Sequence, residues 1–588
     1  MSIYCYADDV TTHTRRLFLQ TLPVAASLRA ASAKPNVIIL LTDDQGYGDL
    51  SCHGNPVLRT PNMDRLHGLS IRFTDFHASP MCTPCRGQLM SGMDALHNKA
   101  TSVTAGRAVL RRDVSTMADV FAASGYRTGL FGKWHLGDHY PYRPTDRGFH
   151  EAKYFRGFGM SSAPEFDNDY FNGRYLHNGV PKQFQGYCTD FWFGEAMNWM
   201  REQHQQNQPF FCYLPTNAPH GPAWVADEFS APYRKPGLPA DFFGMIANID
   251  MNLGKLEHFL TESGLSDNTI FIFMTDNGGT GGVRVFNAGM RGNKTTYYEG
   301  GHRVPCFVRW PAGGLRPVGD VDTTAGMQDW LPTLIDLCGL KRPARANFDG
   351  TSMAALLTSP KQSLPDRMIV VQYGQVPQKW DSCVMWNKWR LVFGRELYDL
   401  KTDPGQKTDL SSKFPNIVEK MRQHYERWWA PIAPTLHDFA PISIGSPKEN
   451  PVTLVSSDWQ DIYADNPGHV LSAAGGPRGG PWCIFIENDG EYEIALYRWP
   501  PQLNLPLNAS CPAQRHTKGT LPEGKALPIA RARLVVQGQE ASKPTAAGVT
   551  HAVFPIKLKG GQKTTLQGWF QDANGVDLCG AFYADVKL

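Results

Sequence analysis

The stretch Val37-Ile38-Ile39-Leu40-Leu41-Thr42-Asp43-Asp44 indicates the fold class, because an unbroken apolar run ends directly in polar residues. Continuous apolar runs of this length are typical of strands that are buried on both faces of a parallel sheet. Similar runs occur at residues 128–131, 210–214, 269–274 and 304–310. Apolar residues at helical spacing lie between two of these runs, at positions 246–260. The sequence therefore predicts an α/β fold with a large, mostly parallel sheet covered by helices.

Reactive side chains follow four of these strands at the point where each strand ends. They are Asp43 and Asp44, Lys133 and His135, His220, and Asp276 and Asn277. Ligands of open α/β sheets bind beyond the carboxyl ends of the strands, so we expect these side chains to form one site. A single aspartate after a strand is usually a turn or cap residue, and a single histidine is usually packed or solvated. Four such strand ends together favour a functional site.

The acidic strand ends predict a metal site. Asp43, Asp44, Asp276 and Asn277 offer only hard oxygen donors, which suit Ca²⁺ or Mg²⁺ and disfavour Zn²⁺. A cation would also relieve the mutual repulsion of the carboxylates, and it could lower the pKa of a coordinated hydroxyl. We expect Ca²⁺ as the bound ion.

A cysteine-containing segment, Cys82-Thr83-Pro84-Cys85-Arg86, matches the pattern C-x-P-x-R. Three fixed positions can arise by chance in a chain of this length, so the pattern needs support from its surroundings. Pro84 suits the first turn of a helix, and the unpaired N–H groups at a helix N-terminus favour anions. We therefore expect Cys82 at the start of a helix that faces the polar strand ends.

Taken together, the motifs resemble the type I sulfatases, the formylglycine-dependent, arylsulfatase-like members of the alkaline phosphatase superfamily. The resemblance covers residues 36 to about 310 and keeps the order and spacing of the family. The matching segments are residues 43–50, 60–66, 80–92, 132–137, 218–220, 275–279, 291–294 and 299–305.

The resemblance implies that Cys82 is oxidised after synthesis to formylglycine (3-oxoalanine) by a separate maturation enzyme. The hydrate of this aldehyde would be the nucleophile: one hydroxyl attacks the sulfur of a sulfate ester, and collapse of the other releases sulfate. One Ca²⁺ would be bound by an oxygen of residue 82 together with the side chains of Asp43, Asp44, Asp276 and Asn277.

The same resemblance implies roles for five further side chains. Arg86 would hold the hydrate and the charges of the metal site. Lys133 and Lys294 would bind the sulfate oxygens. His220 would protonate the leaving alcohol, and His135 would remove a proton during the collapse of the hydrate. The implied activity is the hydrolysis of sulfuric esters.

Two residues depart from the family pattern. Cys85 stands where many relatives have serine, so Cys82 and Cys85 also read as a C-x-x-C pair, which would be a redox dithiol or a disulfide. Met93 stands where relatives commonly have arginine, and this affects a local support contact. The pairing of the twelve cysteines cannot be read from their irregular spacing.

The chain is long enough for two or three domains, since 588 residues exceed what one hydrophobic core usually supports. We expect a catalytic domain at 34–365. Residues 366–440 resemble the small C-terminal antiparallel sheet and helix of sulfatases. Short alternating runs between Gly and Pro residues predict an accessory β-sandwich at 445–588. Its tryptophans at positions 459, 482, 499 and 569 could stack on sugar rings, but a role in the core is the better interpretation.

The first 33 residues resemble an export signal. Arg15-Arg16 precedes an apolar run at 21–28 and the small residues 31–33, as in twin-arginine signals that direct bacterial proteins to the periplasm or beyond. An ordinary N-terminal tail is the alternative, because Asp8 and Asp9 are unusual in such a signal. No apolar run after residue 34 reaches the length of a membrane span. A net charge of +3 without a basic cluster does not indicate a nucleic acid partner.

We expect a sulfated polysaccharide, or oligosaccharides from it, as the substrate class, with simple aryl sulfates as unspecific substrates. A phosphoric ester or phosphonate hydrolase with the same modified cysteine is one alternative, although a single metal ion suits the lower charge of a sulfate ester. A non-catalytic protein that binds sulfated glycans is the other. Such a protein would not require the nucleophile Cys82 or the proton carriers His135 and His220.

Overall fold

The computed structural model describes residues 34–588 except 161, 164–167 and 473–476. Pro35–Leu588 forms one compact unit. The predicted export signal at 1–33 lies outside the described residues. Within the described part of the chain, every helix is too short or too polar to cross a membrane.

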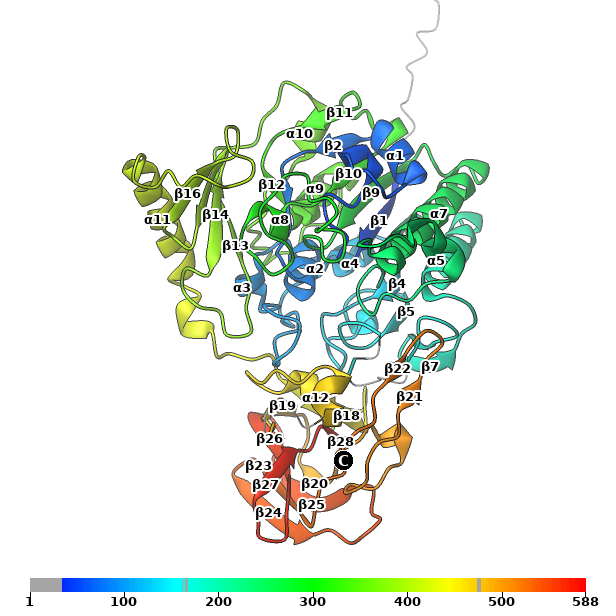
Figure 1. Cartoon of the computed structure of the whole chain (residues 1–588), viewed down its shortest axis with the longest axis vertical. Coiled ribbons are helices and arrows are strands. Elements are labelled where there is room, and N and C mark those ends of the chain that lie inside the picture. The colour runs from blue at the N-terminus through cyan, green and yellow to red at the C-terminus, as the bar shows by residue number, and fades with distance from the viewer. Residues whose placement is uncertain (1–33, 161, 164–167, 473–476) are drawn as a thin grey trace, which may run out of the picture. The chain divides into compact units, whose positions relative to one another are not determined.

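A mixed, ten-stranded sheet forms the centre of the N-terminal part, in the order β11-β2-β10-β9-β1-β8-β4-β5-β6-β7 (Figure 1). Its middle five strands are parallel to one another. They are β9 (Thr269–Thr275), β1 (Asn36–Thr42), β8 (Phe210–Pro215), β4 (Arg127–Lys133) and β5 (Glu151–Phe155). The predicted parallel core of the sheet is therefore confirmed.

Antiparallel strands flank this core on both sides. On one side β10 (Cys306–Arg309) runs antiparallel to β9 and to β2 (Ile71–Phe73), and β11 (Gly319–Val321) lies at the edge. On the other side are β6 (Arg174–His177) and β7 (Val180–Gln183). β10 begins two residues later than the apolar run at 304–310 predicts, because Pro305 has no N–H for the ladder.

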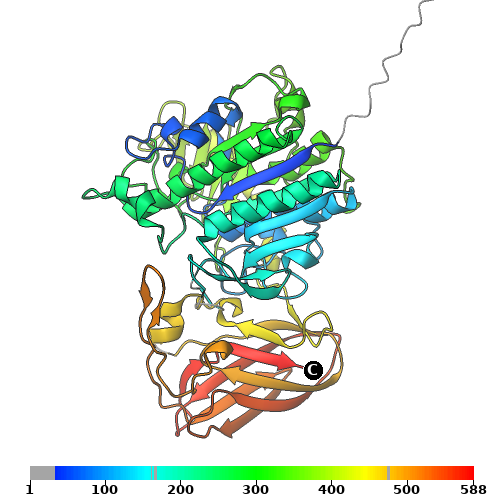
Figure 2. The same ribbon diagram turned by 90° about the vertical axis from the view of Figure 1, so that its right-hand side faces the viewer.

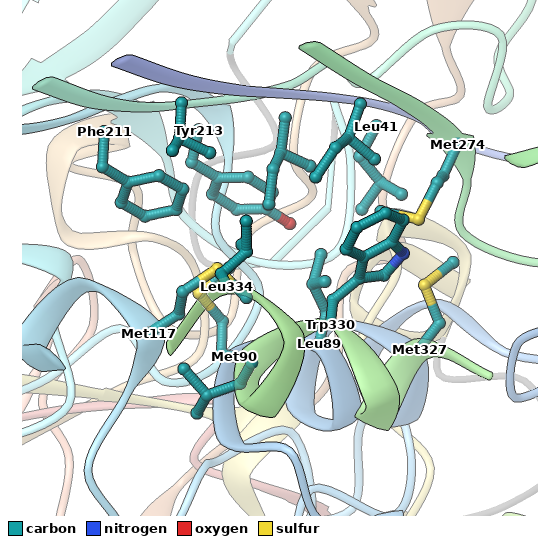
Figure 3. Close-up of a cluster of buried hydrophobic side chains, with 14 of the residues drawn as sticks. Leu41, Leu89, Met90, Met117, Phe211, Tyr213, Met274, Met327, Trp330 and Leu334 are labelled. Atoms are coloured by element: carbon teal, nitrogen blue, oxygen red, sulfur yellow. The ribbon is translucent and has the colours of Figure 1, made fainter. Parts of the chain in front are cut away.

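Both faces of the sheet are covered, which explains the unbroken apolar run of β1. Val37, Ile39 and Leu41 face one hydrophobic cluster, with α2 (Cys82–Ser91), α4 (Met117–Ala123) and α9 (Trp330–Cys338). Figure 3 shows Leu41, Met274 and Phe211 of the sheet above Leu89, Met117 and Trp330 of these helices. Ile38 and Leu40 face a second cluster, with α5 (Cys188–Gln205) and α7 (Ala240–Glu262).

A small antiparallel sheet follows, with the order β13-β14-β15-β16. Its strands are β13 (Ile369–Gln372), β14 (Ser382–Trp386), β15 (Trp389–Val392) and β16 (Glu396–Asp399). The helix α11 (Pro415–Trp429) buries Met421, Tyr425 and Trp429 in the same cluster as Val384 and Leu391 of the sheet. The apolar residues of α11 recur every three or four positions, and this spacing made the helix predictable.

Two larger sheets form most of the C-terminal part, whose strands run from yellow to red in Figure 2. One contains β17 (Ile442–Ile444), β19 (Trp482–Ile486), β26 (Gln562–Gln571), β23 (Arg531–Val536), β24 (Gln539–Pro544) and β27 (Asp577–Gly580). The other contains β18 (Val452–Val455), β28 (Tyr583–Lys587), β20 (Gly490–Tyr497) and β25 (Ala552–Leu558). Both sheets contribute to one hydrophobic cluster, as in a β-sandwich. Trp459, Trp482 and Trp499 are buried in it, and Trp569 is half-buried.

Candidate active site

The register of two parallel strands brings the first acidic residues together. Thr42 of β1 lies opposite Thr275 of β9, so Asp43 and Asp276 leave the sheet side by side. The backbone N–H of Asp44 donates to Asp276 Oδ1 at 3.1 Å. Each of Asp43, Asp44, Asp276 and Cys82 offers a ligand atom, and these four atoms all lie within 4.8 Å of one another.

The end of β4 adds a lysine to this group. Lys133 is fully buried, and its Nζ donates to Asp43 Oδ2 at 2.6 Å. The preceding residue, Gly132, has φ +128°, and a Cβ there would lie 1.9 Å from the carbonyl oxygen of Pro215 in β8. Only glycine therefore permits the close approach of β4 and β8 that places Lys133 against Asp43.

Cys82 is the first residue of α2 and faces the carboxylates. Its S–H donates to Asp43 Oδ1 at 3.4 Å, and Nζ of Lys294 lies 3.4 Å from its Sγ. One turn later, Arg86 donates from Nη2 to Asp276 Oδ2 at 2.9 Å and from Nη1 to the carbonyl oxygen of Lys133 at 3.0 Å. The helix therefore carries the cysteine and a buried cation into the same site.

The second cysteine of the C-x-x-C pair, Cys85, is also buried in α2. Cys82 and Cys85 are both free thiols, and the other cysteines in the described part of the chain are free as well. The disulfide interpretation of this pair therefore has no support in the structure.

Lys294 and Asp44 form an ion pair at the edge of the site, with Nζ 2.5 Å from Oδ1. Burial alone would raise the pKa of Asp44, but Lys294 and His220 outweigh it and hold this pKa well below its usual value. Burial would lower the pKa of Lys294, and Asp44 reverses that shift. Both groups are therefore charged at neutral pH.

The two predicted histidines have different environments. His135 places Nε2 3.1 Å from the carbonyl oxygen of Val103, and its buried Nδ1 has no hydrogen-bond partner among the described residues. Burial and the charge of Lys133 hold the pKa of His135 well below its usual value. His220 places Nδ1 2.7 Å from the carbonyl oxygen of Gly221 and Nε2 3.8 Å from Asp44 Oδ2, and burial lowers its pKa to about 4. In the neutral tautomer that donates to the carbonyl oxygen, His135 has its lone pair on Nδ1 and His220 has its lone pair on Nε2.

Two of these residues have an unusual backbone conformation. Asp44 has φ +68° and His135 has φ +56°, although neither is a glycine. Such conformations cost about 1–3 kcal/mol each and cluster at functional sites. Here they turn the chain sharply directly after β1 and just after β4, so that consecutive side chains can point into one site.

The oxygen atoms of the site fit a hard divalent cation. Burial and the neighbouring Asp43 raise the pKa of Asp276 to about 6, as expected for buried carboxylates that lie close together. Oδ1 of Asn277 is buried and has no hydrogen-bond partner among the residues that the structure describes, while its Nδ2 donates to Asp44 Oδ1 at 2.9 Å. This unpaired amide oxygen beside three carboxylates is the kind of donor set that Ca²⁺ takes.

The charges of the side chains balance without such an ion. Asp43, Asp44 and Asp276 contribute three negative charges, and Arg86, Lys133 and Lys294 contribute three positive charges. A divalent cation would leave a net charge of +2, which suits an anionic substrate and an anionic nucleophile.

Residues 35–340, more than half of the chain, match the sequence profile of the Sulfatase family. The chain belongs to the sulfatase family. This sulfatase is accordingly a sulfuric ester hydrolase, and the relatives described next are sulfatases as well.

The relatives include two mammalian sulfatases. Arylsulfatase A of Homo sapiens is 31% identical over 470 residues, which cover 68% of this sulfatase and 89% of the human protein. N-acetylgalactosamine-6-sulfatase of Rattus norvegicus is 29% identical over 377 residues, which cover 59% and 70%. The crystal structure of Ps i-CgsB superposes with a TM-score of 0.60 at 28% identity, covering 67% of this sulfatase and 92% of that chain. Its complex with k-i-k-neocarrahexaose matches equally well.

Two buried contacts made by residues of the matching segments were not identified from the sequence. The hydroxyl of Tyr170 donates to the carbonyl oxygen of His220 at 2.7 Å and so holds the histidine's loop. His302, to which the motif alone assigns no role, is buried with Nδ1 2.9 Å from Nδ1 of His77. These contacts join residues 50 and 225 positions apart, so no local pattern could reveal them.

Proposed function

We propose that this sulfatase hydrolyses sulfate esters of carbohydrates through a nucleophile made from Cys82 by oxidation to formylglycine. The observation that carries the proposal is the position of Cys82 Sγ, 3.4 Å from both Asp43 Oδ1 and Lys294 Nζ at the start of α2. A carbohydrate substrate is supported by the name of the rat relative and by the saccharide complex of Ps i-CgsB.

An unmodified Cys82 would be a poor nucleophile in this environment. Burial raises the pKa of its thiol far above the usual value, and the charge of Asp43 raises it further. The thiol therefore stays protonated at neutral pH, whereas reactive cysteines have a lowered pKa. Conversion to an aldehyde by a maturation enzyme would remove this obstacle, since the aldehyde hydrate offers one hydroxyl for attack on sulfur and another for release of sulfate.

We propose that one Ca²⁺ is bound by Asp43, Asp44, Asp276 and Asn277 together with an oxygen of residue 82. The ion, when bound, supplies positive charge that favours ionisation of the nearby hydroxyl and attracts the anionic ester. Arg86 would then keep Asp276 in place through its 2.9 Å bond, as it does in the structure.

The remaining side chains divide the work on the substrate. Lys133 and Lys294 would bind the sulfate oxygens. In the structure Lys133 pairs with Asp43, and Lys294 pairs with Asp44. His135 has a free lone pair on Nδ1 and would accept the proton when sulfate is released. His220 would carry a proton on Nε2 to the leaving alcohol, and a bound sulfate ester would favour this protonation by its negative charge.

The proposal also covers the organisation of the chain. We take residues 34–365 as the catalytic domain, 366–440 as a subdomain and 445–588 as an accessory domain, in agreement with the positions of the separate sheets. We propose that residues 1–33 direct export to the periplasm or beyond, on the basis of Arg15-Arg16 and the apolar run after them.

The nucleophile can be tested by mass spectrometry of the tryptic peptide 73–86 together with sulfate release from sulfated polysaccharides. We expect an aldehyde at residue 82 in active protein. Cys82→Ala should abolish sulfate release, whereas Cys85→Ser, which changes the neighbouring cysteine, should keep both the aldehyde and the activity. Fully active protein with an unmodified thiol at position 82 would overturn the proposal.

A further inference from the structure

One cavity of the protein is lined by residues outside the candidate active site. It has a volume of about 500 Å³ and is lined by two parts of the chain, one at 99–142 and the other at 438–563. None of the ten candidate site residues is part of its wall. The cavity is therefore a separate feature, and the C-terminal sandwich contributes to it.

Positive charge dominates the wall of this cavity. Lys99, Arg111, Arg112 and Lys563 face two acids, Asp113 and Asp438, which leaves an excess of two positive charges. Asp113 pairs with Arg111, and Asp438 pairs with Lys563 at 2.7 Å. Arg112 has no ion-pair partner in the described part of the chain and is exposed. Its guanidinium is therefore available to an anionic ligand.

The pKa of Lys99 is lowered in this group of cations. Its Nζ donates to the carbonyl oxygen of Thr435 at 2.6 Å, and no carboxylate of the described residues lies within ion-pair distance. Burial lowers the pKa of Lys99, and the nearby Arg111, Arg107 and Lys563 lower it further against the opposing effect of Asp438. A bound anion would relieve this repulsion.

Aromatic rings form another part of the wall. Tyr142 is held by a hydrogen bond from its hydroxyl to the carbonyl oxygen of Pro441 at 2.9 Å. The guanidinium of Arg107 lies 4.5 Å from the centre of the Phe439 ring, and Asp461 holds Arg107 in turn at 2.8 Å. Phe485 adds a half-buried ring. Tyr142 and Phe439 are themselves buried, so Phe485 is the ring of the wall against which a sugar could pack. Sulfate groups suit the neighbouring cations.

We propose that this basic cavity is a second, non-catalytic binding site for a sulfated saccharide. It would hold one part of a polysaccharide chain while another part occupies the active site. The proposal rests on the proposed function for the class of ligand, because the active site is proposed to act on sulfated carbohydrates. The combination of an excess of two positive charges with aromatic rings fits a sulfated sugar better than a neutral one.

The cavity and the active site share one loop. Lys99 and Arg111 lie at its two ends, where the N–H of Arg111 donates to the carbonyl oxygen of Asn98 at 3.2 Å. Between them, Val103 presents the carbonyl oxygen that contacts Nε2 of His135. A saccharide in the cavity would thus contact Lys99 and Arg111, which begin and end the loop whose Val103 contacts His135.

The test uses full-length protein with Arg112→Glu and Lys563→Glu combined, and dextran sulfate and unsulfated dextran as probes. Binding is measured by calorimetry in the Cys82→Ala background, which requires no turnover. We expect about tenfold weaker binding of dextran sulfate, since two exposed charge contacts are reversed, and negligible binding of dextran by either protein. In active protein the KM for a sulfated polysaccharide should rise by a similar factor, with unchanged turnover of 4-nitrophenyl sulfate.

The matched control is Arg345→Glu combined with Lys557→Glu, which reverses two exposed charges outside the cavity wall. This control should bind dextran sulfate like the parent protein. Equal loss in both double variants would overturn the proposal, as would unchanged binding in Arg112→Glu/Lys563→Glu or tighter binding of a DNA oligonucleotide than of dextran sulfate. A failure of the proposed function would be visible separately, as the absence of sulfate release from protein that carries the aldehyde.

Discussion

At the residue scale, the chemistry of the site depends on the positions of a few side chains to within an ångström. Lys133 reaches Asp43 at 2.6 Å because the preceding Gly132 allows β4 to touch β8. Cys82, with its raised thiol pKa, lies between Asp43 and Lys294. Gly132, which has no side chain, therefore controls the position of Lys133, the proposed sulfate-binding cation.

We predict that Gly132→Ala lowers both stability and activity. The new Cβ would meet the backbone oxygen of Pro215 at 1.9 Å, and φ +128° is unfavourable for any side chain. A loss of about 3 kcal/mol or more in the free energy of unfolding is expected, with at least a tenfold loss in kcat/KM as Lys133 moves. Urea unfolding and sulfate release measure the two effects.

Gly179→Ala provides the control for this prediction. Gly179 also has a positive φ, +86°, but nothing lies within 4 Å of its would-be Cβ. We expect a cost of only about 1 kcal/mol and full activity. If the two alanine variants were equally stable, the close contact with Pro215 would not be the reason for the glycine.

At the scale of elements, a hairpin of the C-terminal part contacts the segment that holds His220, the proposed proton donor. Between β21 (Gln514–Arg515) and β22 (Thr520–Leu521), Thr517 donates its backbone N–H to Asp169 Oδ2 at 2.8 Å. Burial would raise the pKa of Asp169, but His516 and Thr517 outweigh it and lower this pKa to about 2. The next residue, Tyr170, holds the carbonyl oxygen of His220.

We predict that Asp169→Ala impairs protonation of the leaving group. Without its anchor, Tyr170 would hold His220 less precisely. In the proposed mechanism a sugar alcohol needs a proton from His220 to leave, whereas 4-nitrophenolate leaves readily as an anion. We therefore expect kcat to fall about tenfold with sulfated sugars and less than twofold with 4-nitrophenyl sulfate, measured side by side.

A suitable control for this variant is Asp572→Ala. Asp572 accepts two backbone N–H bonds in a turn of the sandwich, from Asn574 and Val576, and so loses a comparable set of bonds. The kcat of the Asp572→Ala variant should be unchanged with both substrates. An equal loss of kcat for the two substrates in Asp169→Ala would exclude a specific effect on His220.

At the scale of the whole molecule, a buried histidine of the N-terminal part lies beside two carboxylates of the C-terminal part. His139, which follows β4 along the chain, is buried with ring nitrogens 3.7 Å from Glu449 and 3.5 Å from Asp458. Burial would lower the pKa of His139, but the carboxylates of Asp458 and Glu449 outweigh it and raise this pKa to about 9. The contact therefore depends on a proton that free histidine loses near pH 6.5.

This link predicts a specific dependence of stability on pH. Because the pKa of His139 is higher in the folded state than in the unfolded state, its stabilising effect is complete below pH 6.5 and disappears as the pH rises through 9. The shift corresponds to about 3 kcal/mol at most. The difference in urea midpoint between the parent protein and His139→Gln should therefore shrink between pH 6 and pH 9.5.

The exposed His258, whose carboxylate partner Glu262 is also exposed, offers the comparison. His258→Gln should shift the urea midpoint little at any pH, because exposed ion pairs contribute little. A midpoint difference for His139→Gln that stayed constant from pH 6 to pH 9.5 would show that the histidine is not charged in the folded protein.

The sequence by itself determined the elements and the identity of the reactive groups. Unbroken apolar runs predicted β1, β4, β8 and β9, because strands buried on both faces need apolar residues at every position. The motif around Cys82 and the polar residues after the strands identified the candidate site, since such side chains are rarely placed together at strand ends without a function. One strand boundary was predicted wrongly from the apolar run: β10 starts at Cys306 and not at Val304, because Pro305 has no N–H for the ladder.

Only the tertiary structure decided which groups meet. The hydrogen bonds from Arg86 to Asp276, from Tyr170 to His220 and from Thr517 to Asp169 join residues 190, 50 and 348 positions apart. No periodicity or local motif encodes such contacts, because they follow from how the sheets and loops pack. The basic cavity arose in the same way: its cations are unremarkable in the sequence, and they form a charged wall only where the two parts of the chain come together.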